Sequence, residues 1–428
     1  MDSTLFRRLY GAQVISLLGT GLMTVALGLL AYELAGPDAG RVLGTALAVK
    51  MIAYVVMSPA MRALLTRVPA TRVLVGADLV RVAMAACLPM VGHIWAIYVL
   101  IFALQTASAT FTPTFQAAIA RVVTDRDAYT SAVSASRVAY DLESVGSPAI
   151  AAALLSLVSY SALFACTAIG FAASAVLVSS SGLAQVDRAN PAAQPSASVI
   201  RFWRNTFRGI RFMFSRNVFR IVLWINIPLA AATAVVVVNT VVYVRADAHL
   251  GDTAVAIVLG VFGAGSITAA LVAPWLMRHV GVTTAMIAGA VTGAIGLGAG
   301  AGHLALDWPT GTASIPTLAA IWFVLGAGTS LMSTGTARLI RDHTDDHTRD
   351  DVFTAQFSAS HAAYLATYPL AGWGGALVGN AGSVAALATI ALLGSIGAYS
   401  ALHRSRSTRT EHPVTADNSP KMSPTAAT

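Results

Sequence analysis

The chain carries little charge for its length. Of its 428 residues, 11% are Asp, Glu, Lys or Arg, whereas 56% are hydrophobic. Soluble domains usually contain about 25% charged residues. Because the apolar excess extends along the whole chain, the composition argues against a string of soluble domains and predicts a membrane protein.

Cysteine is also scarce, with only Cys87 and Cys166, and both fall in apolar runs. A disulfide framework is therefore not expected. The sequence has no Cys-x-x-Cys pair, no Gly-x-Ser-x-Gly elbow and no Walker lysine motif. We therefore expect neither ATP hydrolysis nor any other enzymatic activity, and no cofactor. Only Lys50 and Lys421 among the 27 basic residues are lysine, a bias typical of GC-rich bacterial genomes.

Long apolar segments dominate what is present. The first follows Arg7 and Arg8, is about twenty residues long and has no convincing cleavage site after it, which indicates a retained span rather than a signal peptide. A helix needs roughly 20 apolar residues to cross a bilayer, and helices leave no backbone group unpaired in lipid. We predict an all-α protein with twelve transmembrane helices, at about 12–34, 42–63, 72–91, 94–118, 131–157, 160–181, 217–244, 253–277, 282–302, 316–336, 353–379 and 381–402.

The basic residues predict the orientation. With a cytoplasmic N-terminus, nearly all arginines outside the spans fall on the inner side, and Arg41 and Arg245 are the exceptions. The net charge of +8 is therefore explained by topology, and we expect no nucleic-acid partner. The prediction is a multi-pass protein of the bacterial inner membrane with both termini in the cytoplasm. We expect it to be a monomer in the lipid bilayer.

A polar linker divides the chain into equal parts. We predict an N-terminal six-helix half at 1–181, a linker at 182–216, a C-terminal six-helix half at 217–402 and a disordered tail at 403–428. Within the linker, arginines at helical spacing oppose an aromatic stripe of Trp203, Phe207, Ile210 and Phe214. This pattern is typical of a basic amphipathic helix on an anionic membrane surface, although a partner-binding helix has the same signature.

An internal repeat supports the division. The segment "SASRVAY" at 134–140 matches "SASHAAY" at 358–364 in five of seven positions. The match places Arg137 opposite His361, and Tyr140 opposite Tyr364.

Twelve helices in two halves joined by a basic loop resemble the major facilitator superfamily. The segment "SPAMRALLTRVPATRVL" is similar to the family's gating loop, with Arg67 and Arg72 at basic positions, but Thr66 stands where an acid is expected. "GADLVRVA", with Asp78 and Arg81, is similar to the branch of macrolide and enterobactin efflux proteins. "AYDLE" resembles a sub-branch of these exporters, some of them linked to nickel resistance. The resemblance implies transport by alternating access.

We place six charged residues of the first half within the membrane, where charges are costly and usually paired or functional. Asp78 and Arg81 are three residues apart, and Arg137 and Asp141 are four apart, so each pair can meet on one helix face. We interpret Asp78, Arg81 and Arg137 as members of structural ion pairs. Asp141 is also kept as a candidate for substrate or proton binding.

Lys50 and Glu143 have no partner on their own helices. Glu143 shares a face with Tyr140 and Ser147. A carboxylate shielded from water takes up a proton more readily, as a proton-coupled carrier requires. We therefore predict coupling or substrate roles for Glu143, Lys50 and Tyr140, with a plain Lys50–Glu143 ion pair as the alternative.

The second half offers fewer candidates. His361 is the outstanding polar residue within its spans, as a functional group or as an ordinary core histidine. The loop "RDHTDDHTRDD" contains His343 and His347 among aspartates, a set that suits Ni, Zn or Co. A solvated acidic loop is the alternative.

The sequence thus predicts a secondary active exporter, with protons exchanged for a small amphiphilic, drug-like compound. The alternatives are a divalent metal exporter, an importer, and a membrane sensor or scaffold that does not transport. An intramembrane enzyme is disfavoured because Asp141 and Glu143 point to different sides of their helix.

Overall fold

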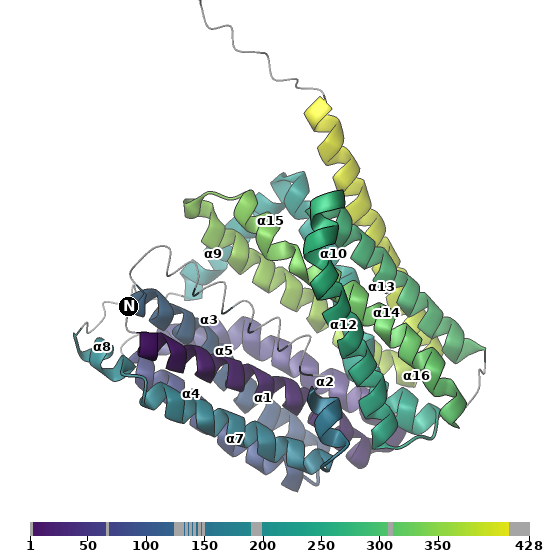
Figure 1. Cartoon of the computed structure of the whole chain (residues 1–428), viewed down its shortest axis with the longest axis horizontal. Helices are drawn as coiled ribbons and strands as arrows, with labels where there is room; N and C mark the ends of the chain where they lie inside the picture. Colours follow the sequence, from purple (N-terminus) through teal and green to yellow (C-terminus); the bar gives the residue numbers. More distant parts are fainter. Residues whose placement is uncertain are drawn as a thin grey trace, which may run out of the picture.

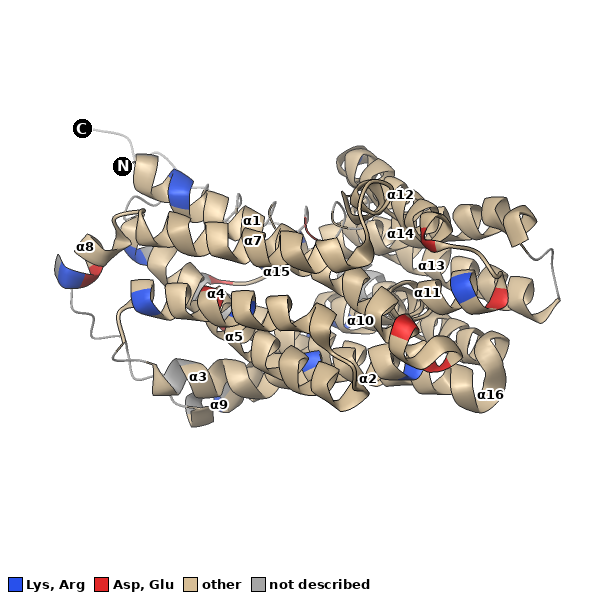
Figure 2. Cartoon of the chain, turned by 90° about the horizontal axis from the view of Figure 1, so that it is seen from below, with Lys and Arg blue, Asp and Glu red and all other residues tan. Residues whose placement is uncertain are grey.

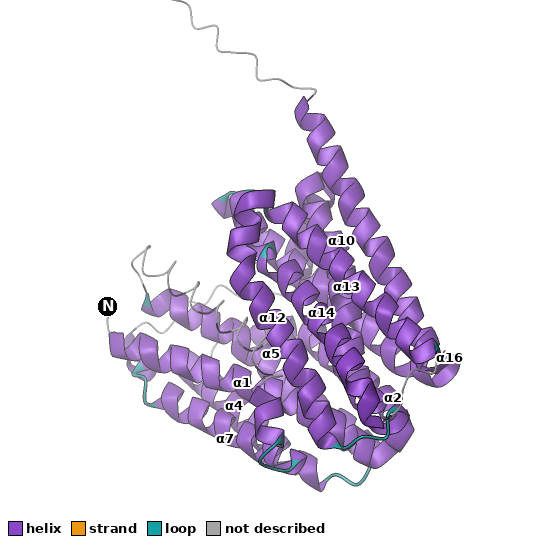
Figure 3. Cartoon of the chain, turned by 45° about the vertical axis from the view of Figure 1, so that its right-hand side comes forward, coloured by secondary structure: helices purple, strands orange, loops and turns teal. Residues whose placement is uncertain are grey.

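The fold is seen in a computed structural model. It describes residues 3–65, 68–123, 150–189, 199–306 and 311–410, together with Ala132, Ser136, Ala139, Glu143 and Ser147. Helices make up nearly all of these residues, and no strand occurs among them (Figure 3).

The N-terminal part consists of long helices joined by short turns. Their bounds are α1 Ser3–Ala35, α2 Ala39–Ile52, α3 Ser58–Leu64, α4 Ala70–Cys87, α5 Ile94–Val122 and α7 Tyr160–Ser179. A π-helical turn, η2 (Ala53–Met57), joins α2 to α3. Two shorter helices follow, α8 Leu183–Ala189 and α9 Val199–Ser215.

The C-terminal part repeats this design. Its helices are α10 Asn217–Ala234, α11 Thr240–Val242, α12 Asp252–Val280, α13 Val282–Ala305, α14 Ile315–Thr334, α15 Thr336–Asp342 and α16 Asp346–Thr410. The segments η4 (Val235–Asn239) and η5 (Tyr243–Asp247) flank α11. The long α16 is broken at Gly379, where φ is +78°, so it makes two passes.

Nine helical segments of the described chain are long and apolar enough to cross a membrane. Two of them, Thr4–Met61 and Asp351–Arg404, contain 58 and 54 residues, which is enough for two passes each. Of the predicted span at 131–157, the structure describes 150–157 and five single residues before them. Charged residues lie mostly toward the two ends of the molecule, and most of the length of the helices carries none (Figure 2). The predicted fold class is confirmed.

The helices form two bundles (Figure 1). In one, α1 packs on α7, and α4 packs on α5 and α7; in the other, α16 packs on α10 and α13, and α14 packs on α12 and α13. The bundles lie together at one end and diverge toward the other. We call these the closed end, which contains η5, the start of α12 and Gly379, and the terminal end, where α1 begins and where α3, α8, α9 and α15 lie.

A seam between α2 and α16 holds the closed end together. The backbones come so close that a Cβ on Gly44 would lie 2.6 Å from the carbonyl oxygen of Tyr368, and a Cβ on Gly372 would meet the backbone of Gly40. Trp373 covers the outer side of the seam. Its indole Nε1 donates to Thr45 Oγ1 at 3.0 Å, and the Arg41 guanidinium lies 4.7 Å from its ring centre. We call this contact the glycine seam.

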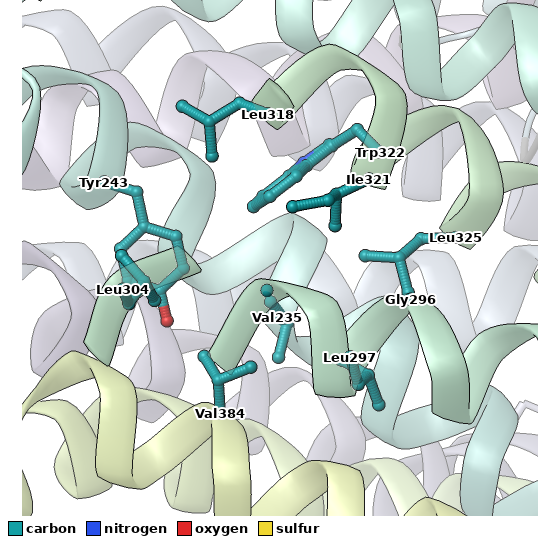
Figure 4. Close-up of a pocket in the computed structure, with 11 residues that line it drawn as sticks. Val235, Tyr243, Gly296, Leu297, Leu304, Leu318, Ile321, Trp322, Leu325 and Val384 are labelled. Atoms are coloured by element: carbon teal, nitrogen blue, oxygen red, sulfur yellow. The ribbon is translucent and has the colours of Figure 1, made fainter. Parts of the chain in front are cut away.

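The C-terminal bundle has a close-packed apolar interior. Trp322 is buried there, and its Nε1 donates to Thr240 Oγ1 at 2.8 Å. Tyr243 meets the Trp322 ring edge-on at 6.3 Å. Figure 4 shows Trp322 and Tyr243 among the residues that line a void of only about 10 Å³, which is about the room that one water molecule needs. This void is a packing gap rather than a binding site.

Two segments differ from the expectations. The residues expected to form an acidic loop are mostly helical, because α15 ends at Asp342 and α16 begins at Asp346. At the other end of α16, the helix continues to Thr410, eight residues beyond the predicted end of the last span.

Candidate functional site

The central polar groups meet where the two bundles begin to separate. Lys50 lies on the last turns of α2, and His361 lies on the first half of α16. Glu143 belongs to the helical positions described between 132 and 150, which recur every three or four residues and so lie on one face. Lys50 interacts electrostatically with both Glu143 and His361. The structure thus brings together three predicted residues from three different parts of the chain.

Lys50 and Glu143 form the charged centre of this site. Both side chains remain partly exposed, so they do not lie in sealed protein core. Glu143 is held in place by α1. Its Cγ would lie 3.7 Å from a Cβ on Gly21, and that Cβ would collide with Ser147. A glycine at position 21 therefore lets α1 approach the helix face that carries Glu143.

Aromatic rings form a wall beside the charges. His361 stacks on Phe357 with 3.9 Å between ring centres and on Tyr54 at 5.6 Å. Tyr54 lies in η2, one turn beyond Lys50. The wall therefore contains rings from both bundles, and any relative movement of the bundles changes it.

The hydrogen bonds of His361 assign its tautomer. Its Nδ1 lies 2.7 Å from the carbonyl oxygen of Phe357. Because a carbonyl can only accept, Nδ1 carries the proton and donates it. Nε2 of the neutral ring is then left as an acceptor that can bind a substrate donor or take up a proton.

Two tyrosines continue the wall toward the closed end. Tyr364 and Tyr368 stack with 5.4 Å between ring centres, and Tyr364 hydrogen-bonds to Thr233 of α10. Tyr368 also interacts electrostatically with Glu143, and its backbone belongs to the glycine seam. The seam therefore closes the site on the side of the closed end.

Asp78 and Arg81 form a separate polar cluster inside the N-terminal bundle. The two side chains make an ion pair and are 0% and 2% exposed as residues. The guanidinium also donates to Ser16 Oγ at 2.8 Å and lies 4.4 Å from the ring centres of both Phe111 and Phe171. Such burial from all sides points to a role in holding α1, α4, α5 and α7 together.

Of five further predicted residues, the structure describes Arg72 alone. Arg67, Arg137, Tyr140 and Asp141 lie outside the described residues. Arg72 is exposed on the first turn of α4, next to Thr71, whose hydroxyl donates to Asp187 at 2.8 Å.

The proposed metal loop gains no support from its geometry. His343 is exposed, and its Nδ1 lies 3.0 Å from the carbonyl oxygen of Leu339, so one ring nitrogen is already used. His347 lies on the first turn of α16. No group of three His, Cys, Asp or Glu residues placed to hold a metal occurs in the part of the chain that the structure describes.

A second cavity lies at the closed end. It has a volume of about 190 Å³ and is lined by residues of both bundles, including Asp38, Arg41, Asn239, Asp247 and Asn380. Gly40 and Gly372 of the glycine seam also line this cavity.

The sequence interpretation selected His361 but missed Tyr54, Phe357 and Tyr368 as members of the site. Phe357, His361, Tyr364 and Tyr368 follow one another at intervals of four, three and four residues, which places them on one helix face. That spacing could have identified the wall on α16. Tyr54 gave no such signal, because its role depends on the packing of α2 against α16.

Comparison with known proteins agrees with this architecture. The profile of the family described as Major Facilitator Superfamily matches residues 9–297 and 229–425. No curated protein matches the chain.

Several solved structures share the fold. A POT family transporter in complex with a thioalcohol-conjugated peptide has a TM-score of 0.71 at 11% identity, with 93% of this chain and 96% of that chain covered. A bacterial homologue of the iron transporter ferroportin, in an inward-facing state, has a TM-score of 0.60 at 15% identity, with 91% and 98% covered. The nucleoside transporter NupG has a TM-score of 0.61 at 13% identity, with 94% and 99% covered. At these identities the likeness shows the fold alone.

Proposed function

The chain belongs to the major facilitator superfamily and is a multi-pass membrane transporter, and we propose that it exports a small amphiphilic compound in exchange for protons. The observation that carries the proposal is the convergence of Lys50, Glu143 and His361 between the two bundles. Ionisable residues within membrane helices are costly and usually mark a substrate or proton pathway.

The terminal end would face the cytoplasm of a bacterium. Most of the basic residues outside the spans belong to the loops of this end, and such loops stay inside the cell. On this assignment the bundles diverge toward the cytoplasm (Figure 1) and are held together toward the outside by the glycine seam. Rocking of the two bundles about the central site would reverse this arrangement.

Exchange follows from the pairing of Lys50 with Glu143. An ionised Glu143 balances the charge of Lys50. A proton on Glu143 occupies the carboxylate that would otherwise accept a hydrogen bond from a polar group of the substrate. Proton and substrate therefore compete for the same pair, and release of one favours binding of the other.

The aromatic wall suggests the type of substrate. Tyr54, Phe357, Tyr364 and Tyr368 offer apolar ring faces, while Lys50 and His361 offer polar contacts. A molecule with an apolar body and one or two polar groups fits both features. The direction of transport rests on the resemblance to efflux proteins.

Export of a divalent metal is less well supported. The ammonium of Lys50 lies at the centre of the site and repels cations. A metal exporter would also be expected to bring several ligands together, and Glu143 and His361 are the two candidates in the described part of the site. A sensor without transport activity would not need a charged pair at the point where the bundles separate.

The test begins with a sensitive host that expresses the chain. Growth is measured across a panel of amphiphilic drugs and of nickel and cobalt salts. We expect protection against one or more of the drugs. Protection restricted to metals would replace the proposal by metal export, and protection against nothing in the panel would favour the sensor.

The second step tests the coupling residue. Uptake of a protecting drug into inverted vesicles is measured with and without an imposed pH gradient, and drug-for-drug exchange is measured in vesicles preloaded with the drug. We expect Glu143→Gln to abolish gradient-driven accumulation but to keep exchange of drug for drug, because exchange needs only the rocking of the bundles. Glu33→Gln makes the same chemical change at an exposed position of α1 and should behave like the parent. Accumulation at the parental rate in Glu143→Gln would show that the proton is carried by another residue.

A further inference from the structure

The linker helix α9 is held against the C-terminal bundle by one of its faces. Thr206 and Met213 are buried, with exposed fractions of 1% and 0%. Between them, Gly209 permits close contact with α16, because a Cβ there would lie 2.8 Å from the Cβ of Ala355. Arg208 adds an ion pair to Asp351, with its Nε donating to the carboxylate at 2.7 Å. The helix is therefore fixed in rotation about its axis.

A second face of α9 is apolar but not covered. Ile200, Phe207 and Phe214 are 79%, 65% and 59% exposed. They are seven residues apart, which is close to two helical turns, so they form one stripe along the helix. The expected aromatic stripe is thus divided, because Ile210 turns partly toward the protein while Phe207 and Phe214 turn away from it.

A third face is basic. Arg204, Arg208 and Arg211 are exposed and are spaced by four and three residues, so they project from one side. Arg208 pairs with Asp351. Arg204 and Arg211 make no ion pair with any residue that the structure describes. The exposed apolar stripe and the basic face lie next to each other, because Phe207 and Arg211 are one turn apart.

The position of α9 places these faces at the membrane surface. The transmembrane helix α10 begins at Asn217, two residues after α9 ends at Ser215. The other neighbours of α9 are α3 and the start of α16, both at the terminal end (Figure 1). An exposed aromatic stripe at this level meets the boundary between acyl chains and headgroups rather than bulk water.

We propose that α9 is a binding site for anionic phospholipid of the leaflet at the terminal end, with Phe207 and Phe214 among the acyl chains and Arg204 and Arg211 on headgroup phosphates. Guanidinium groups bind phosphate through paired hydrogen bonds. Charge complementarity favours an anionic lipid over a soluble protein. The apolar stripe and the basic face lie side by side at the membrane surface, where one lipid offers acyl chains to the stripe and a phosphate to the arginines. The site also contacts both halves, through α3 and α16.

The size of the effect follows from the two free arginines. A basic residue near an anionic bilayer surface contributes about five-fold to affinity. Loss of both charges should therefore weaken binding about 25-fold.

The test uses the full-length protein in detergent micelles, titrated with phosphatidylglycerol and observed by native mass spectrometry. Phosphatidylcholine serves as the neutral lipid. We expect preferential binding of phosphatidylglycerol to the parent, and a loss of about 25-fold in its affinity in Arg204→Gln with Arg211→Gln. The control variant, Arg188→Gln with Arg278→Gln, removes two other exposed arginines of the terminal end and should keep the parental affinity. Equal loss in both double variants would reduce the effect to net charge and overturn the proposal.

Two further arms complete the experiment. Inorganic phosphate at millimolar concentration should not displace the lipid, because it cannot use the aromatic stripe. Full displacement would show a phosphate site instead. Phe207→Ser with Phe214→Ser should also lower the affinity for phosphatidylglycerol, while thermal unfolding in phosphatidylcholine stays as in the parent. Unchanged affinity in this variant would show that the stripe does not contact lipid.

Discussion

Replacement of Gly44 by alanine should open the glycine seam. The added Cβ would lie 2.6 Å from the carbonyl oxygen of Tyr368 and 3.2 Å from the Cα of Gly372, whereas ordinary contact begins at 3.4 Å. The helices α2 and α16 must therefore move apart by about 0.8 Å at this point. Both contacted atoms are backbone, so no side chain can rotate away.

The added methyl group should raise the free energy of the state in which the closed end is shut. Overpacking in a tight interior typically costs about 1–3 kcal/mol, and about 1.4 kcal/mol corresponds to a factor of ten in an equilibrium constant. In a state with the closed end open, α2 and α16 are apart there and the methyl group is tolerated. Gly44→Ala should thus shift the balance between the two states by roughly five-fold to one hundred-fold.

The shift can be measured as a distance between two spin labels. Cysteines at Glu33 and Leu306, both exposed at the closed end of opposite bundles, report its width in a background without the native cysteines. We expect a long-distance population to grow in Gly44→Ala. The matched control is Gly302→Ala, where nothing lies within 4 Å of the added Cβ. Identical distance distributions in the two variants would refute the account of the seam.

Four other outcomes are expected. Asp78→Asn leaves the buried Arg81 without its ion-pair partner and should lower stability by about 3–5 kcal/mol, seen as a reduced folded yield in size-exclusion chromatography; an undiminished yield would contradict the structural role. A cysteine at Glu33 should react with an impermeant reagent from outside intact cells, and one at His343 only after permeabilisation; a reversed pattern at either site would invert the topology. His343→Ala should leave nickel tolerance unchanged in growth assays, and a clear loss of tolerance would return the metal loop to consideration. His361→Phe keeps a ring in the aromatic stack but removes Nε2, so drug export should fall at least ten-fold while folded yield is retained; full activity would exclude a role for that nitrogen.

Features governed by local spacing could be predicted from the sequence. The apolar segments defined the helical fold, since each must satisfy its own backbone in lipid. The three-residue spacing of Asp78 and Arg81 indicated the ion pair that the structure contains. Lys50 and Glu143 were selected because neither had a partner on its own helix, and the structure places them near each other.

Features that depend on helix packing could not be predicted. Tyr54 joins the aromatic wall only because α2 runs antiparallel to α16 at the right register, and nothing near Tyr54 in the sequence encodes that register. The same holds for the glycine seam, whose members come from α2 and α16. The hydrogen bond between the ring of His343 and Leu339 of α15 was also not predicted, because the end of that helix was not anticipated. The metal-binding role of His343 stays a prediction.

The fluorescence of Trp373 should report whether the glycine seam is closed. Its indole touches Arg41 and Thr45 across the glycine seam, so separation of the bundles exchanges a cationic neighbour for water, to which indole emission responds. The chain has seven tryptophans, and a variant that retains this one would emit from the seam alone. Unlabelled compounds could then be sorted by whether they change its emission spectrum, before any of them is known to be transported.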